Sequence, residues 1–106
     1  MITYTNISGT AATEIIPKTN GDGRLSSISI ANTHNDSFSV RVYLNTGSTI
    51  YFIIKDTVLP PNTTLVLDDD NVFFNKTDVG LWVALGAAGS GTSEATVITK
   101  IKERKQ

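Results

Sequence analysis

The sequence contains no cysteine, and only one histidine and one tryptophan among its 106 residues. Without cysteine the chain can form neither a disulfide nor a thiolate metal site. A single histidine also excludes, within one chain, the multi-histidine clusters that bind zinc or copper. Charge is scarce as well, because nine basic side chains nearly balance ten acidic ones and leave a formal net charge of −1. Such a balance predicts no general electrostatic attraction to nucleic acid or to a membrane surface.

Long apolar runs are missing too. No stretch approaches the roughly 18 consecutive apolar residues of a membrane-spanning helix. Residues 1–6 carry neither the basic segment nor the apolar core that marks a secretory signal. We therefore expect a chain that stays in the compartment in which it is made and that has no membrane partner.

What the sequence does contain is a series of short strand signals. Residues 38–45 alternate apolar and polar side chains, which is typical of a strand with one solvated face. A short turn with Gly47 follows, and residues 48–55 are apolar on both faces. Similar runs, bounded by glycine, proline, asparagine and aspartate, recur along the chain, and no segment shows helical periodicity. These further runs are 2–7, 13–17, 24–32, 63–67, 72–75, 81–85 and 94–102.

This spacing predicts a single all-β domain over residues 1–106. We expect an antiparallel two-sheet β-sandwich, jelly-roll-like, with about eight short strands. Residues 1–24 would supply the first strands and could form an N-terminal arm, and residues 103–106 would form a frayed, charged tail. A chain of this length buries roughly two-thirds of its unfolded surface, which suffices for one core without disulfides or metals.

The acidic turn 68–71 is the first candidate for a binding site. Calcium takes about six to eight oxygen ligands, and Asp68, Asp70 and Asn71 could supply some of them. An EF-hand loop needs further ligands and a glutamate downstream, and neither is present here. Asp68 to Asp70 are therefore better explained as a solvated hairpin turn, and we expect no metal and no cofactor.

His34 lies in a polar turn with Asp36 and Ser37. These residue types serve acid–base chemistry, but a Ser-His-Asp triad is assembled from distant segments and needs an oxyanion hole. No nucleophile elbow is present, so a solvent-exposed turn histidine is the favoured interpretation. The glycine-rich run 86–91 lacks the Lys-Ser/Thr pair of a phosphate-binding loop. We expect a mobile loop there, no catalytic residue and hence no enzyme.

The strongest functional signal is an excess of large apolar side chains over the needs of one core. Residues 50–54 and 81–85 are apolar on both faces. One face of each strand can fill the core, so the other must be covered by a loop, a sugar or another subunit. Aromatic side chains on an outer sheet face serve sugar stacking and subunit interfaces alike. The sequence thus predicts an interface that includes Tyr43, Tyr51, Ile53 and Trp82.

Taken together, several runs resemble the small β-sandwich virion proteins of tailed bacteriophages. The shared pattern is a strand that ends in asparagine, an apolar hairpin, a leucine-proline crossing into a Thr-Leu-x-Leu strand, and a late strand near the C-terminus. The resemblance covers about residues 25–102 and leaves out the first two dozen. It is carried by Ile-Ser-Ile-Ala-Asn at 28–32, Val-Arg-Val-Tyr-Leu at 40–44, Tyr-Phe-Ile-Ile-Lys at 51–55, Leu-Pro-Pro-Asn-Thr-Thr-Leu-Val-Leu at 59–67 and Ala-Thr-Val-Ile-Thr-Lys at 95–100.

The resemblance implies a non-enzymatic structural protein of the virion, assembled in the host cytoplasm. Within that class a capsid decoration (cement) protein that stabilises the head is favoured, because the chain is small and has one domain. Such a protein is expected to be a homo-oligomer, with a trimer favoured, and to contact the major capsid protein or other virion proteins, the N-terminal segment included. A tail, baseplate or fibre-associated module is the alternative within the class. Outside it, Trp82 and the tyrosines could form the stacking platform of a carbohydrate-binding module.

Overall fold

The computed structural model of the chain describes residues 2–17, 22–67, 72–75 and 79–103. All of the regular secondary structure in these segments is β-strand, so the all-β prediction is confirmed. Consistent with this, no helix long and apolar enough to cross a membrane occurs in the described segments. The strands are β1 (Ile2–Ser8), β2 (Thr13–Ile16), β3 (Asp22–Asn32), β4 (Phe38–Asn45), β5 (Ile50–Leu59), β6 (Thr64–Leu67), β7 (Val72–Asn75), β8 (Gly80–Leu85) and β9 (Glu94–Glu103).

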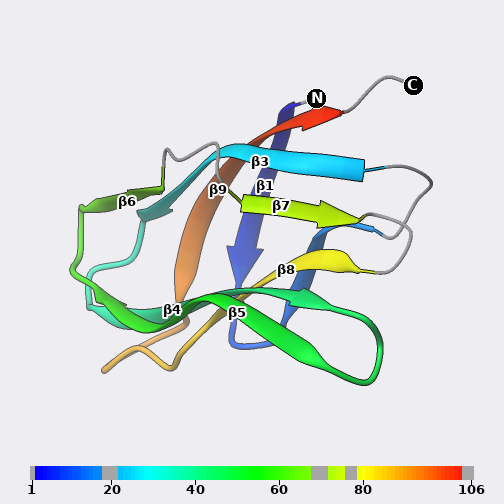
Figure 1. Cartoon of the computed structure of the whole chain (residues 1–106). Helices are drawn as coiled ribbons and strands as arrows, with labels where there is room; N and C mark the ends of the chain where they lie inside the picture. The colour runs from blue at the N-terminus through cyan, green and yellow to red at the C-terminus, as the bar shows by residue number, and fades with distance from the viewer. Residues whose placement is uncertain (1, 18–21, 68–71, 76–78, 104–106) are drawn as a thin grey trace.

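The strands form two antiparallel sheets that lie one above the other (Figure 1). Sheet A has the order β1-β9-β3-β6, with β7 also paired to β3, and sheet B has the order β2-β8-β4-β5. The chain crosses between the sheets at most connections, and β4 and β5 form a hairpin within sheet B. This order is that of an eight-stranded jelly roll, to which β7 adds a ninth strand. The predicted antiparallel sandwich is thus confirmed.

Strand β4 illustrates why the sequence folds in this way. Its side chains alternate between the two faces of sheet B, so that Val40 and Val42 are fully buried while Arg41 is exposed. Neighbouring β8 repeats the pattern with Leu81 and Val83 on the buried face. Burying an aliphatic side chain of this size stabilises the fold by about 1.5–3 kcal/mol. The alternation in sequence therefore fixes which face of sheet B turns toward sheet A.

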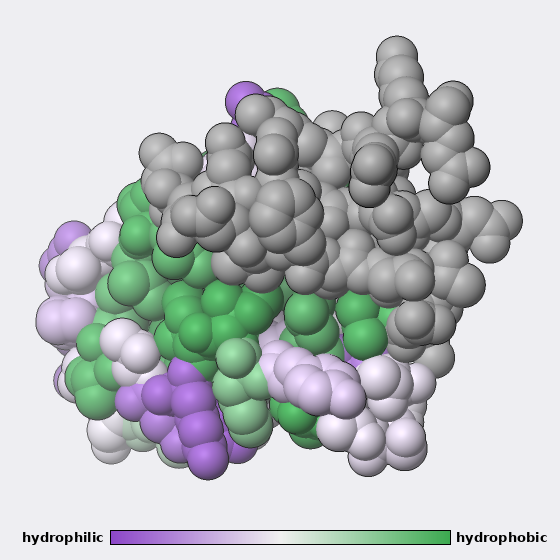
Figure 2. All heavy atoms as spheres, viewed as in Figure 1, coloured by the Kyte–Doolittle hydropathy of each residue, from purple (hydrophilic) through white to green (hydrophobic). Residues whose placement is uncertain are grey.

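One core fills the space between the sheets. Figure 2 shows apolar residues, in green, gathered between β6 and β5. Leu65 and Leu67 of β6 and Ile53 and Ile54 of β5 are partly buried and pack against the core. The fully formed core draws on both sheets and continues into Val79 before β8. Its buried members are Ile7, Ile15, Ile16, Ile28, Ile30, Phe38, Val40, Val42, Leu59, Val79, Leu81, Val83, Leu85, Ala95, Val97 and Ile101.

Residues 1–24 are expected to supply the first strands and could form an arm. In the structure, residues 2–8 and 13–16 of this segment are strands β1 and β2 of the sandwich. Strand β1 pairs with β9 without a register shift, from Ile2 opposite Lys100 to Ser8 opposite Glu94. The last strand, β9, runs to Glu103, one residue into the expected tail. The acidic turn with Asp68 to Asp70, and the tail beyond Glu103, lie outside the described residues.

Candidate interaction surface

Three aromatic side chains lie in one row across the outer face of sheet B. Tyr43, in the interior strand β4, is directly opposite Trp82 on β8 and Phe52 on β5. The Tyr43 and Trp82 rings are nearly parallel, with an interplanar angle of 5° and centroids 6.5 Å apart. Phe52 meets Tyr43 edge to face at 5.8 Å and 62°. We call Trp82, Tyr43 and Phe52 the aromatic row.

The members of the aromatic row differ in exposure. Tyr43 is 7% exposed although it points away from the core, whereas Phe52 is 43% exposed and Trp82 is half-buried. Paired aromatic rings attract one another by about 0.5–1.5 kcal/mol beyond the area that they bury. Tyr43 therefore positions the two outer rings, and Phe52 and Trp82 provide the surface that a partner can touch.

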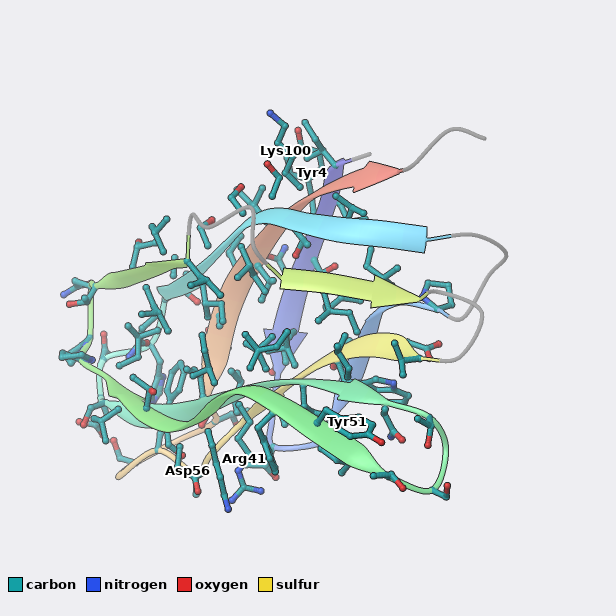
Figure 3. All side chains as sticks on the ribbon, viewed as in Figure 1. Tyr4, Arg41, Tyr51, Asp56 and Lys100 are labelled. Carbon is teal, nitrogen blue, oxygen red and sulfur yellow. The ribbon has the colours of Figure 1, made fainter. Side chains whose placement is uncertain are left out.

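Charged side chains border the row on the β4–β5 side. Lys55 Nζ lies 5.2 Å from the centroid of the Phe52 ring, within the range of a cation–π contact. Arg41, two residues before Tyr43 on the same face, donates from Nε to Asp56 Oδ1 at 2.5 Å. Both partners are about half exposed, and Figure 3 shows them pointing away from sheet A. The row is thus flanked by a lysine and by a solvent-facing ion pair.

This ion pair shifts both titrations. The hydrogen bond from Arg41 is the largest influence on Asp56 and holds its pKa below the ordinary value of 3.8, against desolvation, which raises it; the charges of Arg41 and Lys55 lower it further. The same hydrogen bond, with the Asp56 charge, raises the pKa of Arg41. Arg41 and Asp56 are therefore both charged at neutral pH, next to the aromatic row.

The other end of the row meets strand β2. Glu14 lies directly opposite Trp82, which places it on the outer face. Gly80 fits between these two side chains, because a Cβ atom there would lie 3.1 Å from Glu14 Oε2 and 3.4 Å from Trp82 Nε1. Such a Cβ atom would also lie 3.0 Å from the Ile16 carbonyl oxygen, so the glycine leaves room for both side chains at the start of β8.

The faces of β5 differ from the predicted alternation. Register shifts against β4 leave Ile54 opposite the buried Val42 and Phe52 opposite Tyr43, with Ile53 as the extra residue. Ile53 is half-buried and packs against the core, so its expected place on the outer face is wrong. A β-bulge puts two residues of one strand opposite one residue of its neighbour, and this reverses the faces beyond it.

Phe52 is the outward-facing aromatic residue that strict alternation in the sequence misses. Tyr51, which was expected in the interface, is 56% exposed near the free end of the β4–β5 hairpin and lies opposite Leu44. Ile50 beside it is exposed as well. Ile50 and Tyr51 therefore continue, along edge strand β5, the exposed apolar side chains that begin with Phe52, a member of the aromatic row.

His34 and Asp36 do meet a serine, but it is Ser90 in the loop before β9. His34 Nε2 donates to the backbone oxygen of Ser90 at 2.5 Å, and the Ser90 hydroxyl donates to Asp36 Oδ2 at 2.5 Å. A triad would instead place the histidine ring between the serine hydroxyl and the carboxylate. These contacts fasten the 33–37 turn to the glycine-rich loop that was expected to be mobile. Within the described segments, no three His, Cys, Asp or Glu side chains form a group that could hold a metal.

No protein-family model and no curated protein sequence matches the chain. Among solved structures, the chain resembles one described as the crystal structure of PirA, with a TM-score of 0.54 and 16% sequence identity. The alignment covers 95% of this chain and 93% of that chain. At this level of identity the likeness concerns the fold alone, and it extends over essentially the whole sandwich.

Proposed function

We propose that the chain is a non-enzymatic structural protein of a tailed-phage virion, in the first place a capsid decoration protein that stabilises the head. The observation that carries the proposal is the aromatic row with its exposed neighbours on β5. Monomeric proteins rarely expose a contiguous apolar patch larger than a few hundred Å2. Protein interfaces are enriched in aromatic residues and arginine, and Arg41 lies beside the row. These features favour a surface that another protein covers.

The fold is compatible with a virion role by analogy alone. Jelly rolls occur in viral capsid proteins and also in lectins, so the fold does not by itself distinguish a virion protein from a carbohydrate-binding protein. The sequence resemblance over residues 25–102 then favours the virion. Under this proposal the partners are the major capsid protein or other virion proteins, and the chain itself forms a homo-oligomer. The preference for a trimer comes from the resemblance, and a position in the tail, baseplate or fibre remains the alternative.

A carbohydrate-binding module is the second candidate, because Trp82 and Phe52 both face outward. Sugar stacking uses an open ring face. Here Tyr43 is buried between its neighbours, and the Phe52 ring is inclined by 62° to it with Lys55 over its face. The row therefore lacks one flat platform of three rings, and this geometry favours a protein partner over a glycan.

Electron microscopy of the assembled particle, with this chain located in the density, tests the proposal. We expect the chain on the head, with sheet B turned toward a neighbouring subunit. Titration of the purified chain with glycans, followed by the fluorescence of its one tryptophan, tests the second candidate. A particle that lacks the chain, together with a glycan-dependent shift of Trp82 emission, would overturn the virion proposal in favour of sugar binding.

A further inference from the structure

Strand β1 forms an open edge of sheet A. Among the described strands it pairs with β9 alone, and it lies at one end of the strand order β1-β9-β3-β6. All of its residues, Ile2–Ser8, pair in unbroken register, and its sequence ITYTNIS contains no charge and no proline. An edge strand presents a row of N–H and C=O groups that another strand can use.

The other edges carry features that block such pairing. Strand β2 is short, contains Glu14 and has a register shift against β8. Strand β5 has register shifts and Asp56 in the left-handed conformation, with φ of 53°. Strands β6 and β7 have four residues each, and Pro60 and Pro61 precede β6. Short strands, charges, prolines and bulges all protect sheet edges. Strand β1 has none of them.

The side chains beside this edge are apolar and exposed. Tyr4 is 74% exposed and Ile2 is 50% exposed, and Ile98 opposite Tyr4 on β9 is also open to solvent. Figure 3 shows Tyr4 and Lys100 pointing away from sheet B, on the outer side of sheet A. A strand added to β1 would therefore extend a surface that already carries apolar side chains.

We propose that β1 pairs antiparallel with β1 of a second copy of this chain, so that the two A sheets become one continuous sheet. An uncharged edge disfavours a strand that brings charged side chains to the contact, because burial would desolvate them. Among the edge strands in the described part of the chain, β1 alone is both uncharged and longer than four residues. Antiparallel pairing of identical strands also gives a closed two-fold contact. The inference rests on the edges of the fold and is independent of the proposed virion role.

The alternation of β1 determines the register. Directly opposed residues of an antiparallel pair point to the same side, so the exposed Tyr4 and Asn6 must oppose exposed residues of the second copy. The register that pairs every residue of β1 has its two-fold axis at Thr5. It places Tyr4 opposite Asn6 of the second copy, and Asn6 opposite Tyr4 of the second copy.

Charge-swapped variants test this register. In the double variant Tyr4→Lys/Asn6→Lys, a lysine at position 4 of one copy faces a lysine at position 6 of the other. In Tyr4→Glu/Asn6→Glu, two glutamates face each other at the same places. We expect the wild-type chain to show twice the mass of one chain by light scattering. Each variant alone should self-associate at least about tenfold more weakly, because like charges face each other. An equimolar mixture of the two variants should regain the dimer. Both positions are exposed, so circular dichroism of each variant should match that of the wild type.

Val66→Lys is the matched control, because Val66 is exposed on β6 at the opposite edge of sheet A. It adds a lysine to the same sheet at an exposed position far along the strand order from β1, and it should leave the dimer unchanged. A wild-type chain that is monomeric at high micromolar concentration, or an oligomer that both charged variants leave intact, would contradict the inference. A monomeric wild-type chain would also count against the proposed homo-oligomer, but neither result bears on the location of the chain in particles, which tests the virion proposal separately.

Discussion

Thr3 and Thr99 lie directly opposite each other on β1 and β9, and the hydroxyl oxygens of both are buried without a hydrogen-bond partner in the described part of the chain. Thr99 is fully buried. A buried hydroxyl without a partner costs free energy, on the order of 1–3 kcal/mol. The pair is thus a point at which the fold is less stable than an apolar sequence of the same shape would be.

Thr99→Val should stabilise the fold. The substitution replaces the buried hydroxyl by a methyl group of similar shape, and we expect the free energy of unfolding to rise by about 1 kcal/mol. For a chain of this size the melting temperature should rise by about 4–8 °C. Thr96→Val on the same strand is the control, because the Thr96 hydroxyl already donates to Asn6 Oδ1 at 2.8 Å. A control that stabilises equally would mean that β-propensity, and not the buried hydroxyl, causes the gain.

Gly86→Ala should destabilise the chain by about 1–3 kcal/mol, as is typical of overpacking. A Cβ atom at Gly86 would meet Ser39 Oγ at 2.2 Å, and the Gly86 N–H already donates to the Ser39 carbonyl at 2.7 Å. Ser39→Ala should recover most of the loss, because the nearest remaining side-chain atom would be Ser39 Cβ at 3.4 Å. Denaturant unfolding of the two single variants and the double variant measures the coupling. Additive effects would contradict a direct clash.

The Arg41–Asp56 pair should make stability depend on pH at the acidic end. The pKa of Asp56 is lower in the folded chain than its ordinary value of 3.8, so the folded state favours the carboxylate. This contribution is fully present above the ordinary value and is lost as the pH falls through the lower folded value. Because both side chains are half exposed, the effect should be small and should weaken with added salt.

Asp56→Asn isolates that contribution, since asparagine also accepts the left-handed backbone found at position 56. We expect the melting temperature of this variant to fall less between pH 6 and pH 2 than that of the wild type. Thermal melting over this range, at low and high salt, provides the measurement. Parallel pH profiles for the two proteins would show that the ion pair contributes nothing.

Tyr43→Ala tests whether Tyr43 stabilises the fold and holds the rings of Trp82 and Phe52 in place, while those two rings provide the exposed surface. Tyr43 is buried between Trp82 and Phe52, so we expect a loss of about 3 kcal/mol in unfolding free energy. The emission of Trp82 should also shift to the red as its ring becomes solvated. Phe52→Ser, at a more exposed position, should cost clearly less stability. Equal losses would mean that the row is a second core and not a surface.

The sequence predicted the fold well and the outer surface only in part. Period-two alternation predicted the bounds of β4 and the two-sheet architecture, because a strand with one buried face alternates apolar and polar residues along the sequence. The faces of β5 could not be predicted, because a bulge at Ile53 depends on pairing with β4 and leaves no signal in β5 alone. Alternation therefore agrees with the structure on the outward position of Trp82, but it misplaced Ile53 and missed Phe52. Tyr51 is exposed, yet it lies opposite Leu44, which packs against the core, and so it is not on the expected outer face.

Contacts between distant loops were equally hidden. Ser90 lies 56 residues from His34, and no local pattern links the two. The buried Asn32 is a similar case, since its side-chain amide donates to the carbonyls of Asp36 and Leu59. A sequence read along its length shows neither contact, because the jelly-roll crossings bring these loops together only in the folded chain.

The proposed contact between the outer face of sheet B and another virion protein can be tested with phage particles assembled without this chain. The measurement is the affinity of the purified chain for these particles, compared between wild type, Phe52→Lys and Val66→Lys. Phe52→Lys places a charge in the middle of the proposed contact and should weaken binding at least about tenfold, while Val66→Lys on sheet A should bind like the wild type. Wild-type binding by Phe52→Lys, with its fold intact by circular dichroism, would contradict the account.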